Sequence, residues 1–351
     1  MDYPRCLVLF NQAIKTERTK QNYNYCLSKF LEFAKSRIAN LTVDSLSKIP
    51  QKQGQILIED YVFYLKNKEL SGRSIKNCIT PLKLFFEMND KSFNWLKIQK
   101  MIPENDVFIQ DEPHTKETII KMLANMRSVE DKALLMVLAS SGCRVGMVLE
   151  FRICDMKPMP DGSQCITVYA RTRSAYTTFI TAEAYQSVQD WLAKRKQRGE
   201  NLTTEDLVFP RKPSDYSAYF SGLCRTLGIS DKIGNHQRRI KAVHGLRKRF
   251  NTILKSKSDI NPSLAERLLG HSVSIRLDNA YFRPSESDLF ATYQKIIPDL
   301  VIDEKYHLQN EIAQKEAHIQ TLQDEKDNKI KELEQKLELI SQHLSNLSIK
   351  S

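Results

Sequence analysis

The sequence predicts a mainly α-helical protein that carries a small β-hairpin or sheet and ends in a coiled coil. Three patterns support this fold class: helical spacing of apolar residues through the first hundred positions, one strand-rich stretch near the middle, and apolar heptads after Asp303. A chain of 351 residues is long enough for two or three domains.

The chain is basic. Its 53 Lys and Arg against 42 Asp and Glu give a net charge of +11 and a pI near 9.2. Such an excess favours a polyanionic partner such as nucleic acid. An anionic membrane surface would satisfy the same charge, but the one long amphipathic helix carries mixed charges rather than a basic face.

The seven cysteines are scattered and form no Cys-x-x-Cys pair, which argues against structural zinc and predicts reduced thiols in a cytosolic compartment. The apolar run near the start is too short for a signal peptide, and no run of about twenty apolar residues could span a membrane. We therefore expect a soluble, cytoplasmic protein with no metal and no membrane contact.

Residues 1–103 predict a helical domain. Apolar residues recur at helical spacing in 16–36, 54–70 and 71–90, and Ser74 is a candidate N-cap. Pro81 predicts a kink in the last of these helices or a helix that begins there. The polar faces carry three candidate DNA contacts, Lys20, Arg73 and Lys76, for which an ordinary solvated surface is the alternative.

A linker is expected at 104–114, followed by a second domain at 115–300. In that domain the stretch 131–143 predicts a strongly apolar helix that ends at Gly142. The stretch CITVYARTRSAYTTFIT, rich in Thr, Val, Tyr and Ile, predicts a hairpin that turns at 171–175. Helices are expected from there to about Pro298.

The tail at 303–351 predicts a coiled coil. Apolar residues fit one heptad frame up to Leu322 and a second frame from Ile330, with a four-residue stutter near Lys326. The alternative is a single helix packed on its own domain. We expect a coiled coil to support self-association or to recruit a partner.

A basic segment predicts phosphate binding. His244 and Arg247 are three residues apart and so share a helical face. The surrounding HQRRIKAVHGLRKR contains no acidic residue. Arginine suits this role because its planar fork can hold two phosphate oxygens. The candidate DNA contacts of this cluster are Arg238, Arg239, Lys241, Lys248 and Arg249.

Three more residues complete a pattern: Arg144 after the apolar helix, His271 in LLGH, and Tyr281 ten residues later. In this order and spacing the chain resembles the tyrosine recombinases, from about Thr115 to Pro298. The resemblance implies a site-specific recombinase or integrase of a mobile element, acting as a tetramer on two duplexes of DNA in the host-cell interior, associated with the nucleoid. It also implies that the helical residues 1–103 are a core-DNA-binding domain. The run YFRPSESDLFATY is similar to the branch found in archaeal viruses and mobile elements.

The resemblance also implies residue roles. Tyr281 would attack the scissile phosphate and form a 3′-phosphotyrosyl link, a workable role for a phenol when the oxyanion is stabilised. Arg144 and Arg247 would hold the non-bridging oxygens, and His244 and His271 would donate hydrogen bonds or assist proton transfer. Because the link conserves the bond energy, rejoining needs neither ATP nor a metal, and no cofactor is expected.

Two positions depart from the family pattern. The hairpin lysine that protonates the leaving oxygen in the family is matched best by Arg173, a poor proton donor because it stays charged, with Lys157 as a more distant substitute. Met147 stands where the family often has an acidic residue. Two rival functions therefore stay open, a catalytically weakened DNA-binding protein of the same fold and a coiled-coil scaffold. Tyr293 lies too far behind His271 to serve as the nucleophile.

Overall fold

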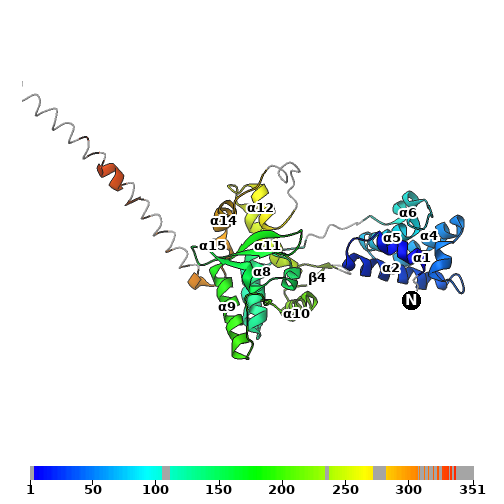
Figure 1. The fold of residues 1–351 in the computed structure, drawn as a ribbon, viewed down its shortest axis with the longest axis horizontal. Coiled ribbons are helices and arrows are strands. Elements are labelled where there is room, and N and C mark those ends of the chain that lie inside the picture. The colour runs from blue at the N-terminus through cyan, green and yellow to red at the C-terminus, as the bar shows by residue number, and fades with distance from the viewer. Residues whose placement is uncertain are drawn as a thin grey trace, which may run out of the picture. The chain divides into compact units, whose positions relative to one another are not determined.

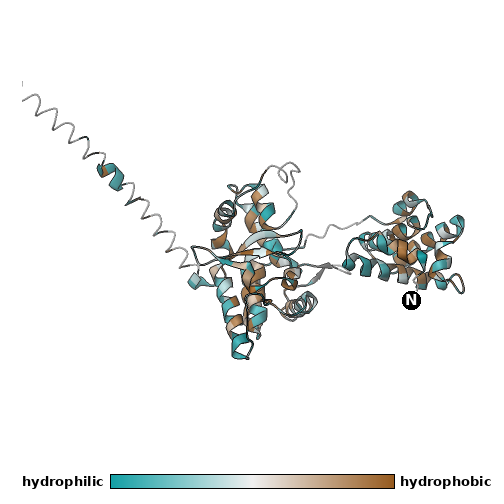
Figure 2. Cartoon of the chain, in the orientation of Figure 1, coloured by the Kyte–Doolittle hydropathy of each residue, from teal (hydrophilic) through white to brown (hydrophobic). Residues whose placement is uncertain are grey.

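The computed structural model describes residues 4–104, 111–233, 237–271 and 282–306, with further positions scattered between 308 and 336. The chain folds into two compact units, 1–108 and 109–351. Each unit has its own apolar interior. Figure 1 shows the helices of each unit, and Figure 2 shows their apolar residues, in brown, concentrated on inner faces. The functions expected for the two domains stay predictions.

The N-terminal unit is built from helices in its described part. They are α1 (Arg5–Gln12), α2 (Glu17–Lys35), α3 (Val43–Ser47), α4 (Gln51–Asn67), α5 (Gly72–Glu87) and α6 (Trp95–Met101). Helix α2 packs against α5, and α1 and α4 pack on the same pair. Four phenylalanines, Phe10, Phe30, Phe85 and Phe86, are fully buried between them and make edge-to-face contacts.

Helix α5 begins earlier than expected. Its N-cap is Ser71, whose side chain accepts the backbone N–H of Ser74, so Ser74 is a residue of the first turn and not the cap. The helix also runs through Pro81 rather than starting there. Proline has no N–H, so the carbonyl four residues back, that of Asn77, loses its usual helical partner.

The second unit is mostly helical with a small sheet. Its helices are α7 (Lys116–Asn125), α8 (Val129–Ser141), α9 (Ala182–Gln197), α10 (Pro213–Thr226), α11 (His244–Ser256), α12 (Pro262–Leu268), α14 (Glu286–Gln294) and α15 (Ile297–Leu300), with 3₁₀ turns η1 (Val145–Leu149) and η2 (Ile153–Asp155). The predicted fold class is confirmed by this mixture; the coiled coil stays a prediction.

The sheet contains the predicted hairpin. Strand β2 (Gln164–Val168) pairs antiparallel with β3 (Tyr176–Ile180), with Val168 opposite Tyr176, so the turn spans 169–175. Strand β1 (Met156–Pro158) pairs with the other edge of β2. A short ribbon of β4 (Lys232–Ile233) and β5 (Gln237–Arg238) precedes α11. Thr, Val, Tyr and Ile side chains suit this half-buried pleated surface.

Helix α8 forms the middle of the unit. Every residue from Ala133 to Ser141 is buried, because α9, α11 and β3 all pack against it. The acidic residues at its start are buried as well. Glu130 and Asp131 both form ion pairs with Arg211, and Tyr216 donates to Glu130, which compensates the buried charges. Met147, where the family often has an acidic residue, is fully buried and packs in the core.

The C-terminal tail is attached through α9. The carboxylate of the buried Glu183 accepts the backbone N–H groups of Ile302 at 2.9 Å and Asp303 at 2.8 Å. Described positions beyond Asp303 are helical from Glu304. Six apolar side chains there are exposed: Leu308, Ile312, Ile319, Leu322, Ile330 and Leu333. Across the described residues, no helix combines the length and apolarity that a membrane span requires.

Candidate active site

Arg247 is the centre of the predicted site. It lies in the first turn of α11, and only 5% of it is exposed. Its Nη1 donates to the carbonyl of Gly142 at 2.7 Å, and its Nη2 donates to the carbonyl of Leu269 at 2.6 Å. These backbone acceptors come from segments on either side of α11 in the sequence. They fix the plane of the guanidinium. Among the described residues, no carboxylate contacts this group directly, so its positive charge is not paired.

The end of α8 supplies the first of these carbonyls. Gly142 has φ 63°, and a Cβ there would lie 2.5 Å from Phe250 Cδ1, so glycine is required both by conformation and by space. Arg144 follows two residues later and is exposed. Burial lowers the pKa of Arg247, and the nearby charge of Arg144 lowers it further, which shows that the two guanidinium groups lie near each other.

His271 joins the same cluster. Its Nε2 lies 2.7 Å from Arg247 Nη2, and its Nδ1 lies 2.6 Å from Glu266 Oε2. Burial raises the pKa of Glu266, but hydrogen bonds from Lys255 and His271 outweigh it and lower that pKa. An ionised carboxylate only accepts, so the proton of neutral His271 lies on Nδ1 and Nε2 accepts from Arg247. Glu266 was not predicted; its position five residues before the histidine in ERLLGH was the available signal.

Tyr176 was also missed by sequence reasoning. Its hydroxyl lies 3.5 Å from Cys143 Sγ, and it is near enough to Arg247 for each side chain to influence the pKa of the other. Burial, together with the neighbouring Cys143, raises the pKa of this phenol well above its ordinary value. Its ring also lies against Gly270, where φ is 61° and a Cβ would be 2.5 Å away. Tyr176 therefore stays uncharged, lines the site and packs against the backbone next to His271.

His244 is exposed at the start of α11. Partial desolvation lowers its pKa, the positive charges of Lys241 and Lys248 act in the same direction, and Asp111 opposes them. The imidazole is therefore neutral at pH 7 and can accept a proton. Among the predicted residues, the structure thus brings together Arg144, Arg247 and His271, with His244 one turn away from Arg247 on the same helix.

Tyr281 lies outside the described residues. The residue after it is held in place, because Arg267 of α12 donates to the carbonyl of Phe282 and lies 5.9 Å from the centre of its ring. The other tyrosine of this segment, Tyr293, is fully buried and donates to the carbonyl of Ser140 at 2.9 Å. Its phenol has no access to a phosphate, in agreement with its rejection on spacing.

Arg173 lies in the hairpin turn and is exposed. The neighbouring Arg171 is engaged elsewhere, since it pairs with Asp155 at 3.0 Å and donates to the carbonyl of Glu150. Lys157, the more distant substitute, pairs with Glu286 at 2.7 Å. Of these three cations, Arg173 is therefore the one in the turn for which the structure shows no ion pair.

The basic cluster is partly neutralised by the linker. Lys241 and Lys248 both pair with Asp111, and Arg239 pairs with Glu112 at 2.8 Å. Arg238 lies in β5, and its side chain is outside the described part. Arg249 corrects the prediction made for it: it is 7% exposed and donates to the carbonyl of Asp299. It holds the C-terminal segment and is not available to DNA in this position.

Two guanidinium groups and an imidazole positioned by a carboxylate are groups whose chemistry suits a phosphoryl anion. The chain belongs to the phage integrase family, whose sequence profile matches residues 112–287. The predicted resemblance to tyrosine recombinases is confirmed. The assignment to the archaeal branch stays a prediction.

Relatives agree with this family. The tyrosine recombinase XerD of Oceanobacillus iheyensis is 23% identical over 301 residues, which cover 81% of this chain and 93% of that protein. The XerH site-specific recombinase bound to its difH substrate has a TM-score of 0.51 at 17% identity and covers 78% of each chain. The Tn1549 transposon integrase in complex with transposon right end DNA has a TM-score of 0.53 at 16% identity, over 83% of this chain and 98% of that one. These structures show the same fold.

Proposed function

We propose that the chain is a site-specific recombinase that cuts and rejoins duplex DNA through a 3′-phosphotyrosyl intermediate on Tyr281. The observation that carries the proposal is the cluster of Arg247, His271 and Glu266 beside Arg144. A phosphodiester gains negative charge on its non-bridging oxygens during transfer, and prepositioned guanidinium groups stabilise that charge without reorganisation.

In the proposed reaction the phenol oxygen of Tyr281 bonds to phosphorus as the bond from phosphorus to the 5′ oxygen breaks. Arg144 and Arg247 hold the non-bridging oxygens. His244, neutral at pH 7, is suited to take the phenol proton, and His271, positioned by Glu266, assists at the phosphate by hydrogen bonding or proton transfer. Arg173 stabilises the leaving alkoxide by its charge. Rejoining is the reverse, with the 5′ hydroxyl as nucleophile.

Duplex DNA is the proposed partner. The XerH, Tn1549 and lambda integrase structures were determined with DNA, and the basic balance of this chain fits a phosphate backbone. In the N-terminal unit Arg73 and Lys76 are exposed near the start of α5, and Lys20 is half-buried on α2. We propose that these side chains contact phosphates when the unit closes on a duplex.

A nicked suicide substrate tests the nucleophile. The DNA, taken from the ends of the element that encodes the protein, is incubated without added metal and run on a denaturing gel. We expect a covalent protein–DNA band that is lost in Tyr281→Phe and kept in Tyr293→Phe, the matched control with a buried ring. Tight binding with no band in the wild type would overturn the recombinase proposal and favour the weakened DNA-binding protein, for which Arg173 is the motivating substitution.

Self-association through the tail is proposed separately. The six exposed apolar side chains between Leu308 and Leu333 need a covering partner, and their heptad spacing fits a second copy of the same helix. Removing everything after Asp303 and measuring mass by light scattering tests this proposal. We expect a smaller assembly; an unchanged mass would sink it, without bearing on the chemistry at Tyr281.

A further inference from the structure

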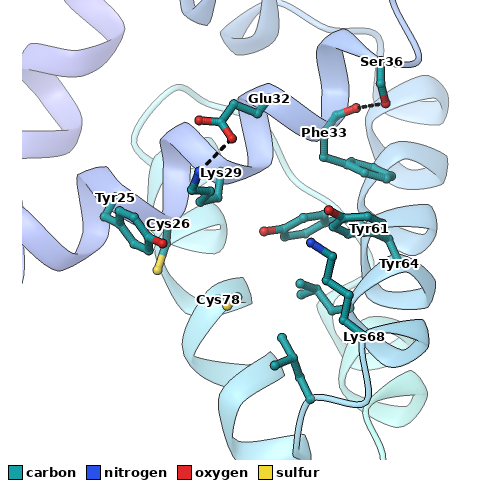
Figure 3. A pocket seen from close by; sticks show the side chains of 12 residues that line it. Tyr25, Cys26, Lys29, Glu32, Phe33, Ser36, Tyr61, Tyr64, Lys68 and Cys78 are labelled. Atoms are coloured by element: carbon teal, nitrogen blue, oxygen red, sulfur yellow. Dashed lines mark hydrogen bonds and ion pairs between the residues drawn. The ribbon is translucent and has the colours of Figure 1, made fainter.

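A pocket in the N-terminal unit holds a pair of thiols that the proposed recombination does not use. It lies between α2, α4 and α5 and has a volume of about 500 Å³. Figure 3 shows Cys26 and Cys78 at one side of it and Tyr61 and Tyr64 at the other. Cys26 is 8% exposed and Cys78 is half-buried, so the pocket gives a small solute access to the pair.

The two cysteines come from helices that pack together. Cys26 lies on α2 and Cys78 on α5, and the two side chains line the same pocket, close enough for each to shift the pKa of the other. Cys26 Sγ also lies 4.0 Å from the carbonyl of Asn77. This carbonyl lacks its helical partner because Pro81 has no N–H. The proline therefore leaves the Asn77 carbonyl, next to Cys78 in the sequence, available to accept from the Cys26 thiol.

The pair is chemically unequal. Contact with Cys26 lowers the pKa of Cys78 to about 7, although burial acts against it, and the same contact raises the pKa of Cys26. Cys78, the more exposed of the two, is therefore the one that ionises more readily to thiolate, the reactive form of cysteine. The other ionisable groups that line the pocket are Lys29 and Glu32 of α2, paired at 2.9 Å, with Tyr25 beside them, and Tyr61, Tyr64 and Lys68 of α4.

We propose that Cys78 and Cys26 form a hydroperoxide-reactive site that closes into a disulfide between α2 and α5. The Cys78 thiolate attacks one peroxide oxygen and becomes a sulfenic acid, while the other oxygen leaves as hydroxide, or as alkoxide from an organic peroxide. Cys26 sulfur then displaces the sulfenic hydroxyl, which leaves as water with the Cys26 proton. Two electrons pass from the thiols to the peroxide. Cys78 is the attacking residue and Cys26 the resolving one.

The disulfide would tie together the two helices that carry Lys20, Arg73 and Lys76. A disulfide needs its sulfurs about 2.05 Å apart, closer than any hydrogen bond between thiols, so the helices must adjust when it forms. The oxidised unit would hold these two helices, and the cations that they carry, in one fixed arrangement. The redox chemistry itself does not depend on the proposed function, since it is detected without DNA.

The test uses the full chain treated with hydrogen peroxide at pH 7, then blocked with iodoacetamide and mapped as peptides by mass spectrometry. We expect a linked Cys26–Cys78 peptide in the wild type and none in Cys78→Ser. In Cys26→Ser, dimedone should trap a sulfenic acid on Cys78. Cys154→Ser is the matched control, because Cys154 is exposed and its described contacts are with Asp155 and Arg171 rather than with a thiol. This substitution should leave the linked peptide unchanged.

A second readout on the reduced wild type does not depend on any variant folding. The rate of Cys78 alkylation should rise with pH through a midpoint near 7. Labelling of Cys154 before Cys78, or a midpoint near the ordinary cysteine value of about 8.5, would overturn the proposal. So would peroxide treatment that leaves both thiols reduced.

Discussion

The two units of the chain handle charge in opposite ways. In the described part of the N-terminal unit no charged side chain is buried, and its interior is apolar and aromatic. The second unit buries six charged side chains: Glu130, Asp131, Glu183, Arg195, Arg247 and Arg249. Each is compensated by a partner, either an opposite charge or a backbone group.

This difference in burial determines what the charged side chains of each unit can do. An exposed cation remains hydrated and mobile, so it adds affinity that salt screens. A buried, hydrogen-bonded cation has already lost its hydration, and removing it leaves its acceptors unsatisfied. The first unit is therefore suited to hold a polyanion and the second to fix one phosphate in place. Four substitutions would break or sharpen this contrast.

The largest effect is expected at Arg247. Arg247→Ala should slow cleavage of a suicide substrate by about 10³-fold, the usual scale for an arginine that stabilises a transferring phosphoryl group. Arg249→Ala is the matched control, since both arginines are buried on α11 and donate to backbone carbonyls. Both variants should unfold more easily in urea, by about 1–3 kcal/mol. Equal losses of cleavage would mean that Arg247 acts only as a structural residue.

The next effect concerns the glycine that positions this arginine. Gly142→Ala should lower the free energy of unfolding by about 2–4 kcal/mol, because it combines left-handed strain with a clash against Phe250. Gly199→Ala also has a positive φ, of 89°, but meets nothing within 4 Å, so it should lose only about 1 kcal/mol. Urea denaturation measures both. If both variants lost the same unfolding free energy, Phe250 would have moved to accommodate the added methyl group at no measurable cost.

A smaller effect is expected from pH through His114, which is 2% exposed with Nε2 2.8 Å from the carbonyl of Ala242. Burial lowers its pKa below the ordinary value, so the unfolded chain binds a proton that the folded chain resists. Stability from this residue is present above pH 6.5 and is lost as pH falls below it, with a slope of at most about 1.4 kcal/mol per pH unit. Denaturant midpoints between pH 7 and 5 should fall less steeply in His114→Gln. Parallel pH profiles for the two proteins would refute this.

The smallest effect is expected from one exposed cation of the first unit. Lys76→Gln should weaken DNA binding only a few-fold and reduce the slope of log affinity against log salt by about 0.9, the release of one counterion. Lys52→Gln removes an equal exposed charge from α4, to which no DNA contact is assigned. Titrations at several salt concentrations compare them. A cleavage defect at saturating protein in Lys76→Gln would break the division of roles between the two units.

Sequence patterns predicted the parts of this molecule that depend on local spacing. The helix with His244 and Arg247 on one face, the glycine stop at Gly142 and the hairpin around 171–175 all follow from residues close together in the chain. The start of α5 was placed three residues late because both Ser71 and Ser74 are capable caps, and only the backbone decides between them.

Contacts between distant segments were not predictable in the same way. Arg249 looked like one more surface cation, but periodicity does not reveal that Asp299 covers it. The pairing of Lys241 and Lys248 with Asp111, across the linker boundary, was hidden for the same reason. Glu266 and Tyr176 reach the site only because α12 and β3 fold against α8 and α11. A single sequence shows the face that a residue occupies and not the segment that meets it.

The attachment of the tail has a mechanical consequence. Because Glu183 holds the backbone at Ile302 and Asp303, a pull on the helix beyond them is carried into α9. That helix packs along α8, whose final turn ends at Gly142 and holds the carbonyl that orients Arg247. Tension at the tail would thus act on the helix next to the one whose end orients Arg247. Any molecule that binds the tail and pulls on it would therefore also apply force to α9.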